Sequence, residues 1–321
     1  MWKDSAAVVV LLAAFGCGGQ SAPTPDPPSD LPPPPATPKA PAPTSPGPAP
    51  TAGPVTTMDR LRFAVVGDTR PASPDDVTGY PTPIITAIYA DIAKRSPPFV
   101  IGTGDYQFSW SRGSGGTASA QLALYMGARA QFKGPFYPVM GNHECTGATA
   151  SNCGPGQDGT TGTYAAFLST MLAPIGQKEP YYAMQVNATD GSWTAKFVFV
   201  AANAWSDAQG TWLEAKLSIP TTYTFVVRHE PARVTEAPGV APSEAIMAKH
   251  PYTIAIVGHS HTFRRESAKE VIVGNGGAPL TGRTNYGYGI FELQKDGQVA
   301  VDMVDYQTLV PEPDQHFTVG P

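Results

Sequence analysis

The sequence predicts an α/β domain, because short apolar runs of strand character alternate with segments of helical periodicity. The runs are rich in β-branched and aromatic residues and are bounded by Gly, Pro or polar residues, as buried strands are. They lie at Leu61–Val66, Phe99–Ile101, Phe136–Met140, Phe197–Ala201, Tyr223–Val227 and Thr253–Val257. Strands that alternate with helices indicate an α/β architecture.

Helical patterns separate several of these runs. Ile84, Ile88 and Ile92 repeat at i, i+4 and i+8, which places them on one face of a helix. Further helical patterns lie at Ala120–Phe132, at Tyr164–Leu172 and around Trp212, Leu213 and Leu217. A late hairpin is expected at Gly289–Asp305, turning on Lys295-Asp296-Gly297.

Residues 1–17 are predicted to form a signal peptide. Lys3 precedes an apolar run from Ala6 to Phe15, which is too short to span a bilayer. The run ends in Ala-Phe-Gly-Cys17, which resembles a bacterial lipobox, where the chain is cut before Cys and that Cys is acylated. We expect an exported lipoprotein of the periplasm or cell surface, lipidated at Cys17 and touching the membrane only through this anchor. Plain secretion is the alternative.

Residues 18–57 are expected to be a Pro-rich tether. Ser21–Thr56 holds 15 prolines in 36 positions, with Ala, Thr, Ser and Gly between them. Such a composition cannot bury a core and favours a semi-extended polyproline II chain. One folded domain is expected over residues 58–310, followed by a tail at 311–321.

The charge pattern argues against a nucleic-acid polymer as partner. The formal net charge is -5, and Lys and Arg are scattered along the chain. Nucleic-acid backbones require a basic stripe or patch. A small anionic substrate remains compatible with this balance, because bound divalent cations can invert the local potential of a site.

Two cysteines remain after Cys17, and they are expected to form a disulfide. Cys145 and Cys153 are separated by seven residues rich in small side chains, which a turn can close. In an oxidising compartment such a pair forms a bridge. The alternative is that Cys145 is a metal ligand or a nucleophile.

Five of the expected strands end in a cluster of polar residues. The clusters are G67-D68-T69-R70, G104-D105-Y106, G141-N142-H143-E144, R228-H229-E230-P231 and G258-H259-S260-H261. In α/β sheets the carboxyl ends of strands form the ligand crevice, so these clusters are expected to converge in space. Convergence of Asp, Asn and His side chains indicates a metal centre.

The order D…GD…GNHE…HxP…GHxH resembles the signature of the calcineurin-like metallophosphoesterases, which include relatives of the purple acid phosphatases. The resemblance covers Arg60 to about Asp305. It implies a four-layer α-β-β-α sandwich with two central mixed sheets. It also implies hydrolysis of a phosphomonoester or phosphodiester by a metal-activated hydroxide, with two divalent ions such as manganese, iron or zinc.

The resemblance also implies a role for each motif residue. The first metal would be bound by Asp68 and His261, with Asp105 bridging to the second, which would be bound by Asn142, His229 and His259. In the family the His of GNH contacts the phosphate or protonates the leaving oxygen, which falls here to His143. Glu144 is expected to orient its neighbours rather than bind metal.

The first motif departs from the family, where it reads Asp-x-His. Here it reads Asp68-Thr69-Arg70, and an arginine cannot bind a metal. Purple acid phosphatases replace this His by a Tyr three residues after the bridging Asp, but Phe108 stands at that position. Three interpretations follow: a weak first site with water in the gap, Arg70 as a bidentate clamp on the substrate phosphate, or a mononuclear centre.

Two rival functions remain open at this point. A lipid-anchored binding protein could retain the ligand-rich fold after losing turnover with its first-site His. A phosphatase of the purple acid type would instead hold an iron centre and be coloured. The sequence does not indicate which ester is cut, and the pocket-forming loops offer no chemical hint.

Overall fold

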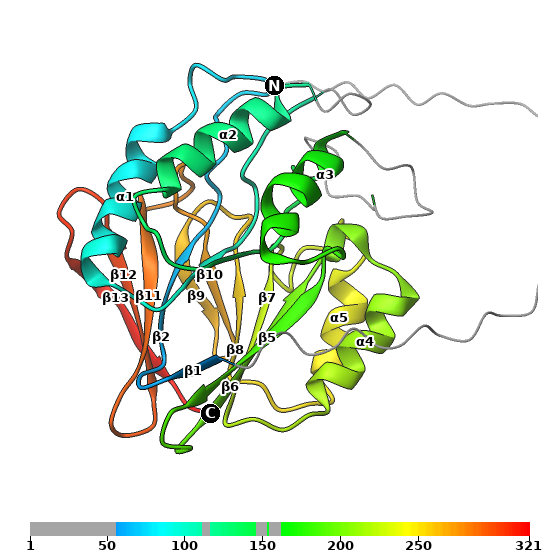
Figure 1. Cartoon of the computed structure of the whole chain (residues 1–321), viewed down its shortest axis with the longest axis vertical. Helices are drawn as coiled ribbons and strands as arrows, with labels where there is room; N and C mark the ends of the chain where they lie inside the picture. The colour runs from blue at the N-terminus through cyan, green and yellow to red at the C-terminus, as the bar shows by residue number, and fades with distance from the viewer. Residues whose placement is uncertain (1–55, 111–115, 146–152, 154–161) are drawn as a thin grey trace, which may run out of the picture. The chain divides into compact units, whose positions relative to one another are not determined.

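The structure is a computed structural model that describes residues 56–110, 116–145, 153 and 162–321 (Figure 1). The expected signal peptide, the lipidation site Cys17 and the tether up to residue 55 lie outside the described residues. Among the described residues, every helix is too short or too polar to cross a membrane.

The first of two sheets has seven strands in the order β1-β5-β6-β7-β8-β10-β9. Parallel pairs such as β6 with β7 occur beside antiparallel pairs such as β5 with β6, so the sheet is mixed. Its strands are β1 (Thr56–Met58), β5 (Tyr182–Ala188), β6 (Thr194–Val200), β7 (Tyr223–Arg228), β8 (Ile254–Val257), β9 (Phe263–Ser267) and β10 (Glu270–Val273).

The second sheet has six strands in the order β13-β12-β11-β2-β3-β4. It is also mixed, because β2 pairs with β3 in parallel and with β11 in antiparallel orientation. Its strands are β2 (Arg62–Val66), β3 (Val100–Gly102), β4 (Phe136–Pro138), β11 (Gly287–Leu293), β12 (Val299–Asp305) and β13 (Pro311–Val319).

Aromatic side chains join the two sheets face to face. Phe63 of β2 stacks on Phe99 and Phe291 of its own sheet, with ring centroids 5.4 and 4.8 Å apart. Its ring edge meets Phe197 of β6 at 5.0 Å and Phe225 of β7 at 5.2 Å. These separations lie within the favourable range for aromatic pairs, so burial of this cluster holds the sheets together.

Helices cover the outer face of each sheet (Figure 1). They are α1 (Thr82–Arg95), α2 (Ala118–Arg129), α3 (Gly162–Phe167), α4 (Asp207–Leu217) and α5 (Val240–Met247). Tyr288 of β11 donates a hydrogen bond to Asp91 of α1, which places α1 on the six-stranded sheet. Trp212 of α4 and Met247 of α5 are buried with Val198 and Val226 of the seven-stranded sheet. The expected four-layer α-β-β-α sandwich with two mixed sheets is confirmed.

Strands of the two sheets lie beyond both ends of the expected domain. Residues 311–321 are not a tail, because β13 pairs with β12 in antiparallel register, Val299 opposite Val319. Its two prolines are tolerated because β13 is an edge strand, where a missing N–H can face solvent. At the other end, β1 begins at Thr56 and pairs with β5, so the last two residues of the expected tether belong to the sheet.

Candidate metal centre

The six expected metal ligands come from both sheets. Asp68, Asp105 and Asn142 follow β2, β3 and β4 of the six-stranded sheet. The three histidines follow β7 and β8 of the seven-stranded sheet: His229, His259 and His261. The candidate centre therefore lies where the carboxyl edges of the two sheets meet, and it depends on their packing.

Four of these ligands adopt a left-handed backbone. Their φ angles are 54° at Asp68, 56° at Asp105, 68° at His259 and 45° at His261. Each such residue costs about 1–3 kcal/mol and persists where neighbours hold it in place. The amide of His259 donates to the Asp68 carboxylate, with its nitrogen 2.9 Å from Oδ2, so one loop fixes the other.

Around His229 the ligand atoms converge on one point. Its Nε2 lies 3.1 Å from Asn142 Oδ1, 3.3 Å from Asp105 Oδ1 and 3.3 Å from His259 Nδ1. Its Nδ1 lies 2.7 Å from the carbonyl oxygen of Thr103, which can only accept, so the ring proton sits on Nδ1. Nε2 then faces two oxygen acceptors, and Asp105, against the effect of burial, raises the pKa of His229, so in the metal-free protein a proton on Nε2 satisfies these oxygens. A metal ion could take the place of that proton.

A second convergent group lies beside the first. One ligand atom each from Asp68, Asp105 and His261 lie within 4.8 Å of one another. His261 Nδ1 lies 2.9 Å from the carbonyl oxygen of Pro279, so its proton is likewise on Nδ1 and Nε2 is free to bind. Asp105 belongs to this group and also contacts His229, as a carboxylate shared between two ions would.

Arg70 places a positive charge at the group of Asp68, Asp105 and His261. Its Nη2 lies 3.4 Å from His261 Nε2, and its Nε lies 3.6 Å from Asp105 Oδ2. The guanidinium stacks on the Phe108 ring at 4.6 Å and donates to the carbonyl of Pro71. Phe108 thus holds the guanidinium of Arg70 by a cation–π contact.

His143 is almost fully buried beside the carboxylate of Asp105. Its Nε2 lies 3.7 Å from Asp105 Oδ2, and its ring meets the Phe108 ring edge at 4.3 Å between centroids. Its Nδ1 is buried and has no hydrogen-bond partner among the described residues. Burial, with the charges of Arg70 and His229, lowers the pKa of His143 to about 3 against the opposing pull of Asp105. The metal-free protein therefore holds this imidazole neutral.

Glu144 ties two ligand loops together. Its carboxylate accepts hydrogen bonds from the backbone amides of Asp105 and Tyr106 at 2.8 Å and of Gly141 at 2.7 Å. Burial and the charge of Asp105 raise the pKa of Glu144 to about 7, although these three donors favour the ionised form. Glu144 orients the loops after β3 and β4, as expected.

The expected disulfide is confirmed. Cys145 and Cys153 are bonded, with their Cα atoms 5.5 Å apart, and both are buried. The alternative in which Cys145 is a metal ligand or nucleophile is therefore wrong. The Cys153 amide donates to the carbonyl of Asn203 at 2.8 Å, which attaches the bridge to the turn after β6.

Comparison with known proteins identifies the family. The family model for calcineurin-like phosphoesterases matches residues 61–263, which contain the six expected metal ligands. The chain belongs to this family. A sequence search of curated proteins found no match for this phosphoesterase.

Solved structures share the fold of this chain. GAP50, the anchor in the inner membrane complex of Plasmodium, is 15% identical with a TM-score of 0.56, and the match covers 82% of this chain and 89% of that one. Purple acid phosphatase PPD1 from yellow lupin is 15% identical with a TM-score of 0.58, covering 84% and 55%. A dimetal phosphatase from Danio rerio is 12% identical with a TM-score of 0.55, covering 81% and 98%.

Sequence reasoning missed two buried residues of this phosphoesterase. Glu230 is fully buried, and one of its carboxylate oxygens lies within 4.8 Å of a ring nitrogen of His229 and of His259. Asn203, also fully buried, donates to Glu230 through its side-chain amide. The available signal was a carboxylate directly after a ligand histidine in R-H-E-P.

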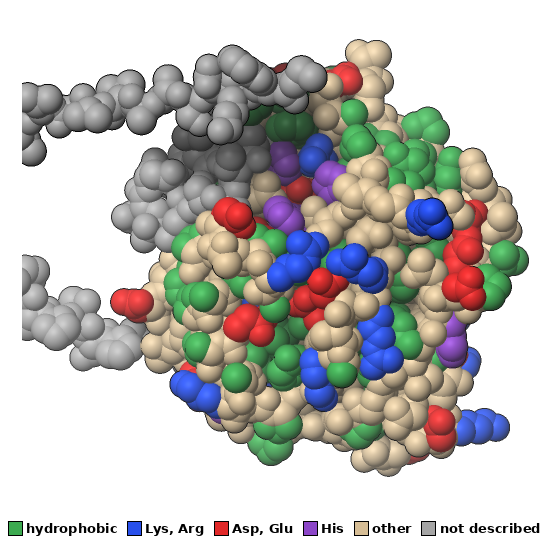
Figure 2. All heavy atoms as spheres, turned by 180° about the vertical axis from the view of Figure 1, so that it is seen from behind, with side chains coloured by type: hydrophobic (Ala, Val, Ile, Leu, Met, Phe, Trp, Pro, Cys, Tyr) green, Lys and Arg blue, Asp and Glu red, His purple; other side chains and the backbone are tan. Residues whose placement is uncertain are grey.

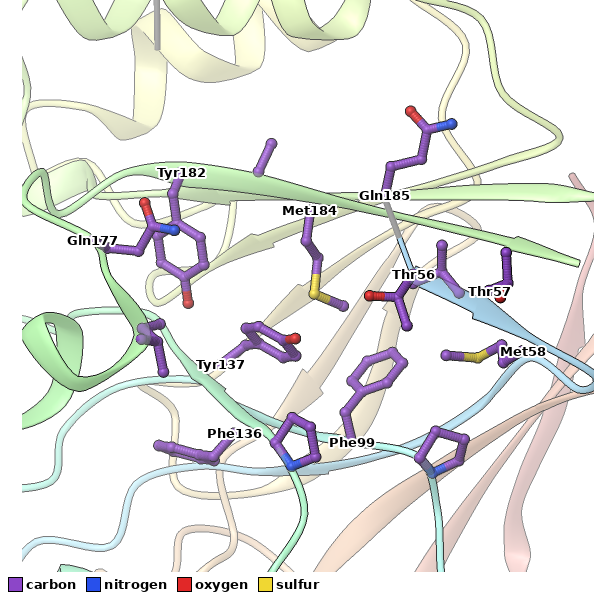
Figure 3. Close-up of a pocket in the computed structure, with 15 residues that line it drawn as sticks. Thr56, Thr57, Met58, Phe99, Phe136, Tyr137, Gln177, Tyr182, Met184 and Gln185 are labelled. Atoms are coloured by element: carbon purple, nitrogen blue, oxygen red, sulfur yellow. The ribbon is translucent and has the colours of Figure 1, made fainter. Parts of the chain in front are cut away.

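The surface carries charge near the site, whereas an apolar cavity lies elsewhere. Figure 2 shows histidine side chains gathered on one face, with arginine or lysine and acidic side chains beside them. A cavity of about 390 Å³ is lined by Phe99, Tyr137, Tyr182 and Met184, among others (Figure 3). The residues that line this cavity include none of the expected metal ligands.

Proposed function

We propose that this phosphoesterase hydrolyses small phosphate monoesters or diesters with two divalent metal ions. The observation that carries the proposal is the convergence of Nε2 of His229 with the oxygens of Asn142 and Asp105, beside a second convergent group of Asp68, Asp105 and His261. In the metal-free protein Asp105 raises the pKa of His229, so a proton occupies Nε2. A divalent ion in place of that proton would be held by a set of nitrogen and oxygen donors suited to manganese, iron or zinc.

The ligands divide between two ions that share one carboxylate. Asp68 and His261 would hold the first, Asn142, His229 and His259 the second, and Asp105 would bridge them. The ions would supply Lewis-acid activation of a water molecule and would neutralise the phosphate charge.

Two further residues would act on the substrate itself. His143 is neutral and lies beside the carboxylate of Asp105, so its ring N–H can donate a hydrogen bond to a phosphate oxygen. Proton transfer to the leaving oxygen would require the imidazolium form, which the low pKa of His143 disfavours. Arg70 would clamp a phosphate oxygen, since its guanidinium lies at the edge of the first ligand group with its plane held by Phe108.

The site of action is proposed to be outside the cytoplasm, at a membrane reached by a lipid on Cys17 and a Pro-rich tether. The buried disulfide between Cys145 and Cys153 supports an oxidising compartment. The Ala-Phe-Gly-Cys pattern at residues 14–17 supports the lipid.

A second candidate function is a binding protein without turnover. The position of Arg70 favours it, because a guanidinium 3.4 Å from His261 Nε2 opposes metal binding at the first group. One experiment separates the two functions. The full chain is stripped with chelator and titrated with manganese, iron or zinc, while metal stoichiometry and hydrolysis of aryl phosphate monoesters and diesters are followed together.

The hydrolase predicts metal-dependent turnover that the His259→Ala variant loses. Two equivalents of bound metal support the binuclear centre, and one equivalent with turnover supports a mononuclear form. Bound metal without turnover on either ester class supports the binding protein and overturns the hydrolase.

A further inference from the structure

One buried carboxylate beside the second ligand group has no role in the family pattern. Glu230 has 0% of its surface exposed. One of its oxygens accepts from the side-chain amide of Asn203, and the other, Oε2, is buried without a hydrogen-bond partner among the described residues. Oε2 is thus a buried acceptor that no donor of the described residues reaches.

A buried carboxylate in this condition requires a proton or a cation. An ionised carboxylate without sufficient partners costs several kcal/mol in a protein interior. The nearest arginine does not supply the cation, because Arg228 is bound elsewhere. Its Nε donates to the Glu230 backbone carbonyl at 2.8 Å, its Nη1 to Ser243 at 2.8 Å, and its Nη2 to Glu244 at 2.7 Å.

Glu230 also lies close to two of the expected metal-binding histidines. A Glu230 oxygen and one ring nitrogen each of His229 and His259 lie within 4.8 Å of one another, a separation that ligands of a single ion can have. The side chain is also held in place. Asn203, which donates to its other oxygen, has its own carbonyl bound by the amide of Cys153 at 2.8 Å.

We infer that Glu230 is a further ligand of the second metal ion, in addition to Asn142, His229, His259 and the shared Asp105. This inference rests on the proposed metal centre and deepens it. The second site then has three oxygen and two nitrogen donors with two carboxylate charges. Such a set favours harder ions such as Mn²⁺ over ions that prefer sulfur or nitrogen. The Glu230 carboxylate also adds a negative charge to the metal centre, and this charge offsets the positive charge of Arg70 at the first group.

The test measures metal binding directly. The full-length protein and its Glu230→Gln variant are stripped with chelator and titrated with Mn²⁺ by calorimetry, after circular dichroism has shown that both are folded. Gln has the same shape but carries no charge, so we expect at least a tenfold weaker second site. The matched control is Glu270→Gln, which neutralises a buried glutamate next to Arg228 that lies outside the ligand groups. It should bind Mn²⁺ as the wild type does.

Unchanged Mn²⁺ affinity in Glu230→Gln would overturn the inference and identify Glu230 as a protonated structural residue. Should the variant not fold, a crystal structure of the Mn²⁺-loaded wild type decides, because a ligand oxygen lies at bonding distance from the ion. Failure of the proposed hydrolase is recognised separately: the wild type would bind Mn²⁺, with Glu230 contributing, and cleave no ester. A wild type that binds no Mn²⁺ would overturn both.

Discussion

The Nη2 atom of Arg70 lies 3.4 Å from Nε2 of His261, the nitrogen that is free to bind the first metal ion. Because His261 holds its proton on Nδ1, this contact is a hydrogen bond from the guanidinium to the metal-binding lone pair. Arg70, which stands where the family pattern has a histidine, therefore does more than remove one metal ligand from the site. It places a cation against the remaining ligands of that site.

Replacing Arg70 by histidine should strengthen the first metal site. The change removes the competing cation and restores an imidazole in the Asp-x-His pattern, so we expect at least a tenfold higher affinity, about 1.4 kcal/mol. Calorimetric titration of the chelator-stripped protein measures it. The Arg70→Ala variant separates the two causes, since it removes the charge without adding a ligand. Equal affinity in all three proteins would contradict this account of the site.

Replacing Arg70 by alanine should weaken binding of the substrate phosphate. A hydrogen bond between charged partners contributes about 1.5–3 kcal/mol, so the KM for an aryl phosphate should rise about 10- to 100-fold at saturating metal. Steady-state kinetics measure it. Arg264→Ala is the control, since Arg264 is an exposed arginine paired with Glu266. An unchanged KM in Arg70→Ala would count against the clamp.

Replacing Glu144 by glutamine should destabilise the domain by about 2–3 kcal/mol. Both carboxylate oxygens accept backbone amides, so the NH₂ group of Gln would face a donor and leave it unsatisfied. Chemical denaturation of the metal-free protein gives the free energy of unfolding. The exposed Glu236→Gln should leave it unchanged, and equal stability of the two variants would exclude this role for Glu144.

Lys196 should make stability depend on pH above neutrality. This residue of β6 is 4% exposed and donates to the carbonyls of Lys216 and Ile219 at the end of α4. Burial, followed by the charge of Lys216, lowers its pKa from 10.5 to about 8. Between these values the unfolded chain binds more protons than the folded one, so the free energy of unfolding should rise with pH.

The measurement compares wild type with Lys196→Met by denaturation at pH 7.5 and 9.5. Met removes the titrating group and keeps the apolar stem, so the wild type should gain stability relative to the variant at the higher pH. A difference between the two proteins that does not change with pH would show that Lys196 remains charged throughout this range.

Deleting residues 311–321 should lower the melting temperature and promote aggregation. The deletion removes β13 and leaves the edge of β12 unpaired, which is a template for strand addition. Thermal melts and light scattering measure the two effects. Deleting only Gly320 and Pro321, which lie beyond β13, is the control, and identical behaviour of both truncations would mean that β13 contributes no stability.

The strands that carry the site could be predicted from the sequence because they are buried on both faces. The runs at Leu61–Val66 and Tyr223–Val227 are apolar except for Arg62 and Thr224, and β2 and β7 follow them closely. The hairpin at Gly289–Asp305 was confirmed as β11 and β12, with Gly297 at a φ of 82° in the turn. The resemblance to the family then implied the two-sheet arrangement.

The missed strands are those without a strong local signal. β13 contains Pro311 and Pro313 and is largely exposed, so its sequence favours a tail over a strand. The pairing with β12, which precedes it in the chain, decides its conformation and outweighs the low strand propensity of the segment. β5 was missed although its burial alternates residue by residue, because Gln185 and Asn187 interrupt its run of apolar residues.

The candidate site, like the strands, could be predicted from the sequence only in part. The types and order of the ligand residues were visible in the sequence, and the structure brings Asp68, Asp105 and His261 together. The conformation of Arg70 and the burial of Glu230 were not visible, because both depend on how side chains from two sheets pack.

The left-handed backbone at the ligands Asp68, Asp105, His259 and His261 limits how this centre can diverge. Asp, Asn, His and Gly tolerate such φ angles, whereas branched side chains do not. Exchange among the tolerated residues would alter which ion the loops prefer while their path stays intact. A valine or isoleucine at the same positions would disturb the loop before any question of coordination arose. Substitutions at these four positions can therefore change the preferred metal ion more readily than they can change the loop conformation that positions the ligands.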